Sequence, residues 1–327
     1  MLICESTGLE REFRNRFLAA RFLPLALKQR RRTKTLNGME VTALRTCRFI
    51  RKTWGMVLLL NGCSGAAALA ADVPVEPPEG AFVEDDGTSG GFHGIIVLGG
   101  GAQPDFEGAT EYAAIPMLYA NLTAFGLGLE IEGPEAALNL RPDAALQFGP
   151  AIGYDMGRDG TANKVVDRLD RIDGAFEAGG FVAYQFNALL NQSDIFELSA
   201  ELMADVSGVH HGVTGSIGAG YMVAVTEQLR LGTEVSVGFA SDSYMDTYFG
   251  VNKAGALRSG LAEYSASGGI KDISLGATAS FNVTERWGIV GRATYSRLLG
   301  DAADSPIVKD EGSADQFSGG LGISFSF

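Results

Sequence analysis

Histidine is the side chain best suited to acid–base catalysis near neutral pH, and this sequence has 3 of them, His93, His210 and His211. The adjacent pair follows Asp205 and Ser207, so the residue types of a hydrolase triad occur within one short segment. Neighbouring glycines also fit a hairpin tip, and no second Ser, Asn or Asp element completes a triad by motif. A turn is therefore favoured over a hydrolase site, and two adjacent histidines without a third ligand predict no zinc site.

Acidic residues crowd one segment near the carboxy terminus. Oxygen ligands at this density suit Ca²⁺ or Mg²⁺, which could bridge lipopolysaccharide phosphates. The regular order of an EF-hand loop is absent, so a solvated acidic loop is the favoured interpretation. The residues are Asp301, Asp304, Asp310, Glu311 and Asp315. Neither this segment nor the histidines predict a catalytic, cofactor-binding or metal-ligating residue, and no cofactor is expected.

A third set of charged residues occupies alternate positions of segments that look like β-strands, which places them on one face. If that face lines the interior of a barrel, each charge must be paired or hydrated. Paired charges would form a plug-like ladder, whereas hydrated charges would line a narrow, cation-preferring channel, and the sequence leaves both open. The set comprises Glu177, Glu197, Glu201, Asp205, Arg230, Glu234, Asp272, Arg286 and Arg292.

Strands must position these residues, because the hydrophobic pattern repeats every two residues. In residues 196–205, 229–239, 272–281 and 287–296, apolar side chains alternate with polar or small ones. A helix would require a repeat of about 3.6 residues. Strands of about ten residues with one polar and one apolar face are typical of transmembrane barrels. Beyond the amino-terminal region the sequence has no unbroken apolar run of about 18 residues, so no transmembrane helix is predicted.

Connection lengths separate a barrel from a soluble sandwich, which also alternates. Short turns and long loops follow one another here, as in outer-membrane barrels with periplasmic turns and external loops. Short turns are expected near residues 121–123, 141–143, 188–193, 226–228 and 283–285. Long loops are expected near residues 157–173, 244–267 and 300–312.

We therefore predict an all-β fold, a closed antiparallel transmembrane β-barrel at residues 91–327, with about twelve strands in a range of about 10 to 14. An even number of strands places both termini of the barrel on the periplasmic side. The expected strands are 91–102, 111–121, 124–131, 135–140, 144–156, 174–187, 194–206, 211–226, 228–243, 268–283, 286–299 and 313–327.

The last strand ends on an aromatic residue and resembles the signal that outer-membrane proteins present to their assembly machinery. Its apolar side chains share one face, because alternate residues of a strand point the same way. They are Phe317, Leu321, Ile323, Phe325 and Phe327. The edge of such a strand needs a partner, and we expect the first strand to pair with it and close the barrel.

The amino-terminal region predicts secretion. Arg51 and Lys52 precede an apolar run at 54–60, and small residues follow up to Ala70. This order describes a signal peptide at 39–70, cleaved between Ala70 and Ala71. Residues 1–38 would then be a mis-called upstream extension with Met39 as the initiator, and residues 71–90 an acidic, proline-containing periplasmic linker.

Cys63 offers an alternative end to the leader, because the residues before it faintly resemble a lipobox. Cleavage after Ala70 would remove all 3 cysteines and the whole arginine-rich amino-terminal region. The mature chain would then contain no disulfide and would be more acidic than the full chain, whose net charge is −13. A strongly acidic protein is a poor partner for nucleic acid.

Several motifs resemble the MipA/OmpV family of outer-membrane proteins. They include the segments at 104–108, 147–150, 243–250 and 297–308, and the resemblance covers about residues 91–327. It implies an outer-membrane β-barrel. It also implies a scaffold of the kind that joins a lytic transglycosylase to a peptidoglycan synthase, whereas other members resemble surface antigens or adhesins.

The favoured function is therefore a non-enzymatic structural or scaffolding barrel in the envelope of a Gram-negative bacterium. The expected partners are outer-membrane lipid, lipopolysaccharide, the barrel-assembly machinery and a periplasmic murein hydrolase or synthase. A narrow small-solute channel, a surface antigen or adhesin, and a hydrolase acting through His210 are the alternatives.

Overall fold

The computed structural model describes residues 91–327. The predicted upstream extension, the signal peptide at 39–70, the Cys63 alternative and the linker at 71–90 lie outside these residues. Within the described part of the chain, no helix has the length and apolar character needed to cross a membrane.

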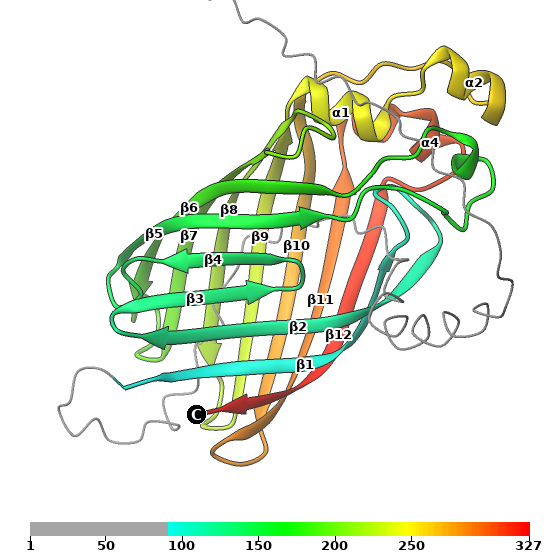
Figure 1. The fold of residues 1–327 in the computed structure, drawn as a ribbon. Coiled ribbons are helices and arrows are strands. Elements are labelled where there is room, and N and C mark those ends of the chain that lie inside the picture. Colours follow the sequence, from blue (N-terminus) through cyan, green and yellow to red (C-terminus); the bar gives the residue numbers. More distant parts are fainter. Residues whose placement is uncertain (1–90) are drawn as a thin grey trace, which may run out of the picture. The chain divides into compact units, whose positions relative to one another are not determined.

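Twelve antiparallel strands form a closed barrel, which confirms the predicted fold class (Figure 1). Each strand pairs with its neighbours in sequence, so the wall is an up-and-down meander. The strands are β1 (His93–Pro104), β2 (Tyr112–Ala124), β3 (Leu127–Glu132), β4 (Glu135–Asn139), β5 (Leu146–Asp155), β6 (Ala175–Asn187), β7 (Asp194–Asp205), β8 (Val213–Ala224), β9 (Leu229–Ala240), β10 (Gly269–Asn282), β11 (Trp287–Leu298) and β12 (Asp315–Ser326).

The first and last strands close the barrel, as the sequence predicted. Their register runs from Ile95 opposite Ser326 to Ala102 opposite Gly319. At the chain end, the N–H of Phe327 donates to the carbonyl of Gly94. Closure leaves no open sheet edge between these strands. An open edge in lipid would leave backbone N–H and C=O groups without hydrogen bonds, which is costly.

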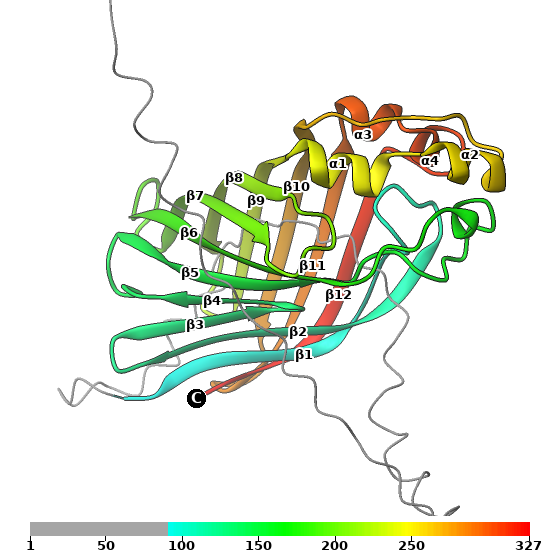
Figure 2. The same ribbon diagram turned by 45° about the horizontal axis from the view of Figure 1, so that its top comes forward.

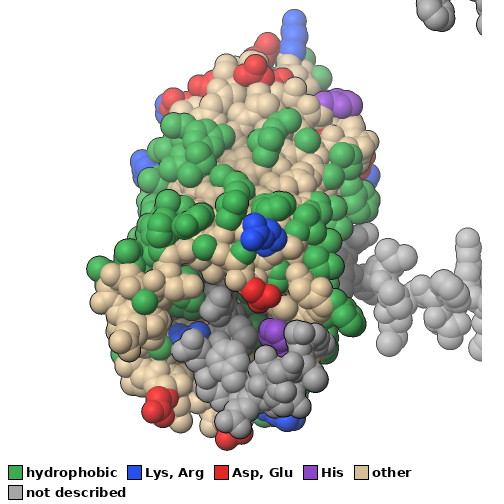
Figure 3. Space-filling model, turned by 90° about the vertical axis from the view of Figure 1, so that its left-hand side faces the viewer, with side chains coloured by type: hydrophobic (Ala, Val, Ile, Leu, Met, Phe, Trp, Pro, Cys, Tyr) green, Lys and Arg blue, Asp and Glu red, His purple; other side chains and the backbone are tan. Residues whose placement is uncertain are grey.

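Apolar side chains point outward from the wall, and hydrophobic groups cover much of the face in Figure 3. Aromatic contacts gather at both ends of the strands. Trp287 contacts Phe325 near one end, and Tyr295 contacts Phe317 near the other. Such belts mark the two lipid–water boundaries of a membrane barrel. We name the end with connections such as 188–193 and 283–286 the turn end, and the opposite end the cap end.

One predicted turn is misplaced. The sequence predicted a turn near residues 121–123, but β2 continues to Ala124 and the turn lies at Phe125 and Gly126. Their φ angles are 55° and 74°. A two-residue hairpin turn of type I′ needs positive φ at both positions, and Gly126 meets this at no steric cost.

The wall has a low section at β3 and β4, which we call the wall step. β2 pairs with β3 only from Tyr119 to Ala124, although β2 itself begins at Tyr112. On the other side, β4 pairs with β5 at Ala136 and Ala137. Figures 1 and 2 show the β3–β4 hairpin ending part-way along the barrel, short of the cap end. The wall step comprises the turn at residues 133–134 and the flanking parts of β2 and β5.

The long connections fold into a cap at the opposite end from the short turns (Figure 2). Its apolar residues form two buried clusters, one around Tyr244, Met245 and Phe249 and one around Phe106 and Ile307. The cap helices are α1 (Asp242–Phe249), α2 (Lys253–Ser259), α3 (Gly300–Asp304) and α4 (Pro306–Lys309), with a 3-10 turn η1 at Val166–Arg168.

Candidate functional site

An arginine of β11 links strands on both sides of the interior. Arg292 Nη1 lies 2.8 Å from Glu132 Oε1 of β3, and its Nη2 lies 3.2 Å from Glu234 Oε2 of β9. In the order of strands around the wall, β3 and β9 lie on opposite sides of β11. Charge-assisted bonds of this kind brace the barrel from inside.

Glutamates gather under the wall step. A small pocket there is lined by Glu130, Glu132, Glu135, Glu201 and Met203. The hydroxyl of Tyr119 donates to Glu130 Oε1 at 2.9 Å. Of these carboxylates only Glu201 was in the predicted ladder. The alternation of Leu127, Leu129 and Ile131 with the glutamates would have placed the others inside, had the preceding turn been predicted correctly.

Other ladder residues take separate positions. Glu197 is buried and accepts a hydrogen bond from Gln185 Nε2 at 2.9 Å. The carboxylate of Asp205 accepts N–H bonds from the β7–β8 loop, including those of Gly208 and His211. Arg286 is exposed in the β10–β11 turn. Arg230 lies near the turn end of β9, Glu177 and Glu234 are buried in β6 and β9, and Asp272 is buried in β10.

A buried ion pair joins the wall to the cap. Lys271 is 1% exposed and its ammonium bonds the carboxylate of Glu107, from the β1–β2 loop. Its Nζ also lies 3.4 Å from Asp272 Oδ2 and 5.5 Å from the ring centre of Tyr244. A register shift between Ile270 and Asp272 accompanies the inward position of Lys271. Alternation alone would place Lys271 outside, so this pair could not be predicted from the sequence pattern.

His210 is buried, and its ring makes edge contacts with Tyr244 and Tyr248, which stack on each other. Its Nδ1 accepts the N–H of Gly212 at 3.1 Å, and its Nε2 lies 3.4 Å from Glu177 Oε1. The hydroxyl of Ser207 instead donates to Asp205, at 2.7 Å. The predicted triad residues thus divide into two separate contacts, and the structure does not bring Ser207 and His210 together as nucleophile and base. His211 is exposed in the same loop, and His93 begins β1.

The acidic residues near the carboxy terminus do not form one cluster but make separate local contacts. Asp315 accepts from Tyr295 and Arg297, each at 2.6 Å. The carboxylate of Asp301 accepts a hydrogen bond from the N–H of Ser267 at 2.8 Å. Residues 91–327 contain no group of three or more acidic, histidine or cysteine side chains placed to hold a metal ion.

The sequence matches the family described as MltA-interacting protein MipA over residues 96–327, most of the described barrel. The chain belongs to this family. Curated relatives carry the name "Putative outer membrane protein YiaT". The MipA-family barrel is thus an outer-membrane protein, as the sequence predicted.

The relatives are distant. The Escherichia coli O157:H7 protein is 28% identical over 183 residues, which cover 56% of this chain and 66% of the relative. The Escherichia coli K12 protein is 28% identical over 131 residues, covering 40% and 51%. The chain thus spans between half and two thirds of these relatives' own length.

Solved outer-membrane channels share the general barrel shape. The DcaP channel of Acinetobacter baumannii is 8% identical with a TM-score of 0.35, covering 72% of this chain and 96% of that one. The COG4313 channel of Pseudomonas putida F1 is 12% identical with a TM-score of 0.37, covering 73% and 96%. Likeness at this level carries no information about transport by the MipA-family barrel.

The cap of the MipA-family barrel has a polar pocket of 550 Å³ between the 156–174 loop, α1 and α2. Arg158 lines it and donates from Nη1 to the carbonyl of Tyr248 at 2.7 Å. Burial lowers the pKa of the Arg158 guanidinium to about 10, and burial raises the pKa of the Tyr248 phenol. At the rim, hydrogen bonds from Asn252 and Arg258 lower the pKa of the Asp170 carboxyl. These contacts fasten α1 and α2 to the 156–174 loop.

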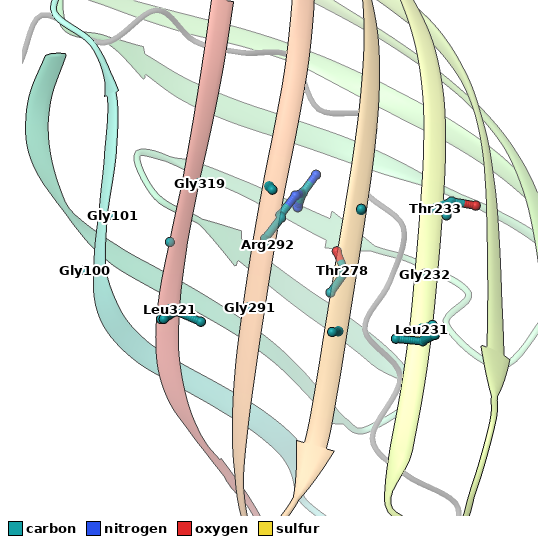
Figure 4. A pocket seen from close by; sticks show the side chains of 14 residues that line it. Gly100, Gly101, Leu231, Gly232, Thr233, Thr278, Gly291, Arg292, Gly319 and Leu321 are labelled. Carbon is teal, nitrogen blue, oxygen red and sulfur yellow. The ribbon is translucent and has the colours of Figure 1, made fainter.

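A shallow groove of 720 Å³ crosses the outer face of β9 to β12 and β1 (Figure 4). Gly100, Leu321, Gly291, Ala279 and Leu231 lie opposite one another in successive strands. The adjacent row contains Gly319, Ala293, Ala277 and Thr233. Small side chains make the wall thin here, and Arg292 and Thr278 belong to the inner face between the two rows.

Proposed function

We propose that this barrel is a non-enzymatic structural protein that serves as a platform in the outer membrane for a periplasmic murein enzyme. The observation that carries the proposal is the cap. Its two apolar clusters are buried above the barrel interior, and residues such as Phe249, Ala302 and Ile307 have no exposed surface. A folded, apolar cap is poorly suited to free passage of polar solutes along the barrel axis.

Internal bracing supports the same function. Lys271 ties the cap to the wall, and Arg292 ties β11 to β3 and β9. A barrel braced at both levels offers a fixed geometry at its turn end. The partner class comes from the family, whose description is MltA-interacting. The periplasmic surfaces for such a partner are the short turns and residues 71–90.

Other expected partners follow from location. Lipid and lipopolysaccharide surround the apolar wall. The assembly machinery would recognise the last strand, whose outward face presents Phe317, Leu321 and Ile323, each more than half exposed. Phe325 and Phe327 extend this face to the chain end.

Site-specific photo-crosslinking in intact cells tests the platform. A photoreactive residue replaces Gln192 or Glu285 at the turn end, and matched controls replace Lys253 or Leu257 on the cap; all four positions are exposed. We expect turn-end positions to crosslink a lytic transglycosylase or peptidoglycan synthase, identified by mass spectrometry, and cap positions not to. Equal crosslinking from the cap, or no murein enzyme from either end, contradicts the proposal.

A narrow cation-selective channel is the second candidate, favoured by the glutamates under the wall step. Fixed negative charge raises the local concentration of cations. Planar-bilayer recording of the refolded protein separates the candidates. Steady, cation-selective single-channel currents would favour the channel, and a silent bilayer containing folded protein favours the platform.

A further inference from the structure

The polar pocket of the cap, which lies beside α1 and α2 (Figure 2), has fixed walls and room for a small molecule. Two isolated antiparallel bridges form part of its lining, one between Arg158 and Ile172 and one between Val251 and Tyr264. In each bridge both N–H groups donate to the carbonyl of the other residue, at 2.8 to 2.9 Å. Its volume of 550 Å³ lies within the range of about 300–1,000 Å³ that is usual for small-molecule sites. Walls fixed in this way lower the free energy needed to order a binding site.

Arg158 brings a buried positive charge to this pocket. The residue is 6% exposed, and its Nη1 donates to the carbonyl of Tyr248 at 2.7 Å. No carboxylate within residues 91–327 forms an ion pair with the guanidinium, and Asp170, which also lines the pocket, pairs with Arg258 instead. A buried charge normally has a partner of opposite sign, and the planar fork of a guanidinium matches a carboxylate. An anionic group bound in the pocket would supply that partner.

Two acids of the lining also lack an ion pair within the described part of the chain. Asp246 is exposed, and its Oδ1 accepts a hydrogen bond from the hydroxyl of Ser265 at 2.9 Å. Glu263 is exposed in the same lining. The remaining charged residues of the lining, Asp170 and Arg171, pair with other residues of the cap. The pocket therefore offers a ligand one buried cation and two exposed anions.

This combination disfavours ligands of a single sign. A plain anion such as phosphate would bind Arg158 but would be repelled by Asp246 and Glu263, which line the same pocket. A plain organic cation would be attracted by the two acids and repelled by the buried guanidinium. A molecule that carries both signs matches the whole lining.

We infer that the cap pocket binds a small zwitterion of the amino-acid type, with its carboxylate on the guanidinium of Arg158 and its ammonium groups at Asp246 and Glu263. A basic amino acid has one carboxylate and two positive groups, which complements the one cation and two anions of the lining. Leu169 and Val251 line the pocket as well and provide apolar surface for an aliphatic chain. The long loops of such barrels are external, so the ligand comes from outside the cell. This binding activity goes beyond the platform role at the turn end and does not depend on it.

Calorimetric titration of L-lysine into the mature protein, folded in nonionic detergent micelles, tests the inference. We expect saturable binding. Lysinamide lacks the carboxylate, and diacetyl-lysine lacks both ammonium groups, so each should bind more weakly by about tenfold or more. Absence of saturable lysine binding, or an affinity for either analogue equal to that for lysine, overturns the inference.

Substitution of the two exposed acids tests the location of the site. The Asp246→Asn, Glu263→Gln double variant should bind L-lysine about tenfold more weakly or worse. The matched control, Asp304→Asn with Asp310→Asn, removes two exposed charges from the cap outside the pocket and should bind like the wild type. Wild-type affinity in the first variant, or an equal loss in the control, overturns the inference.

Substitution of the buried cation tests the role of the carboxylate. Arg158→Gln should lower the affinity for L-lysine and remove most of the preference for lysine over lysinamide. Because Arg158 also bonds the carbonyl of Tyr248, hydrogen exchange at α1 checks that the cap remains folded. A folded Arg158→Gln cap that keeps the wild-type preference for lysine overturns the assignment of the carboxylate to Arg158.

Discussion

Two groups of buried charge in this barrel differ in how they are balanced. At the cap, Lys271 lies between the carboxylates of Glu107 and Asp272, with Tyr244 beside it. Under the wall step, Glu130, Glu135 and Glu201 meet in one pocket with no ion pair to a described cation. The first arrangement is what a structural contact requires, because both signs are present and close. The second places like charges close together, which is electrostatically unfavourable.

The two groups also differ in the elements that hold them. The cap pair joins a loop to a full-height strand through a bulge, and its removal would separate two parts of the fold. The step glutamates come from the short strands β3 and β4 and from β7, which remain paired to their neighbours without them. Substitutions should therefore change the free energy of unfolding in opposite directions: removing a charge should destabilise the protein at the cap pair and should not destabilise it under the wall step.

The largest effect is expected for Lys271→Met. It leaves two buried carboxylates without their cation, and breaking a buried pair typically costs about 3–5 kcal/mol. Urea unfolding of the protein in lipid vesicles, followed by tryptophan fluorescence, measures the loss. Adding Glu107→Gln should restore part of the stability, whereas the exposed Lys309→Met should change nothing. A wild-type midpoint for Lys271→Met would show that the cap pair is not structural.

A smaller loss is expected for Arg292→Met. Its side chain is 18% exposed in the interior, so water can replace part of its bonds to Glu132 and Glu234. We expect about 1–3 kcal/mol of destabilisation in the same urea experiment. A loss as large as that of Lys271→Met in a folded Arg292→Met barrel would contradict the difference drawn between the two groups.

The sequence predicted the wall far better than the charged groups. Period-two alternation and the last strand were enough to give twelve strands and the closing pair, because lipid outside imposes one simple rule on every strand. The cap pair was missed because a bulge reverses the expected direction of Lys271. The wall step was missed because β3 and β4 are short. An error of a few residues in the preceding turn was enough to leave Glu132 and Glu135 out of the predicted set of interior charges. Contacts across the interior, such as Arg292 with Glu132, depend on closure and have no local signal.

A third substitution, Glu135→Gln, should act in the opposite direction. Removing one of several like charges relieves repulsion under the wall step, so stability should be unchanged or rise by up to about 1 kcal/mol. The amide keeps the size of the side chain and its contact over Gly153. Urea unfolding at low and high salt measures the effect, which salt should reduce. A loss comparable to that of Lys271→Met would mean that the glutamate is part of the fold.

The smallest effect is expected on the cap surface, where Asp170 pairs with Arg258 at 2.5 Å and accepts from Asn252 at 2.8 Å. These bonds lower the pKa of the Asp170 carboxyl in the folded state. The unfolded chain then takes up the proton first, so the contribution is present above pH of about 3.8 and is lost as the pH falls further. The pair is exposed to water, so Asp170→Asn should cost only about 0.2–1 kcal/mol. Hydrogen exchange at η1 and α2 should rise in this variant at pH 7 and match the wild type at pH 2, whereas exchange in the strands of the wall should be the same in both proteins at either pH. A wall that exchanges faster in Asp170→Asn would show that the cap contributes to barrel stability through its surface as well as through Lys271.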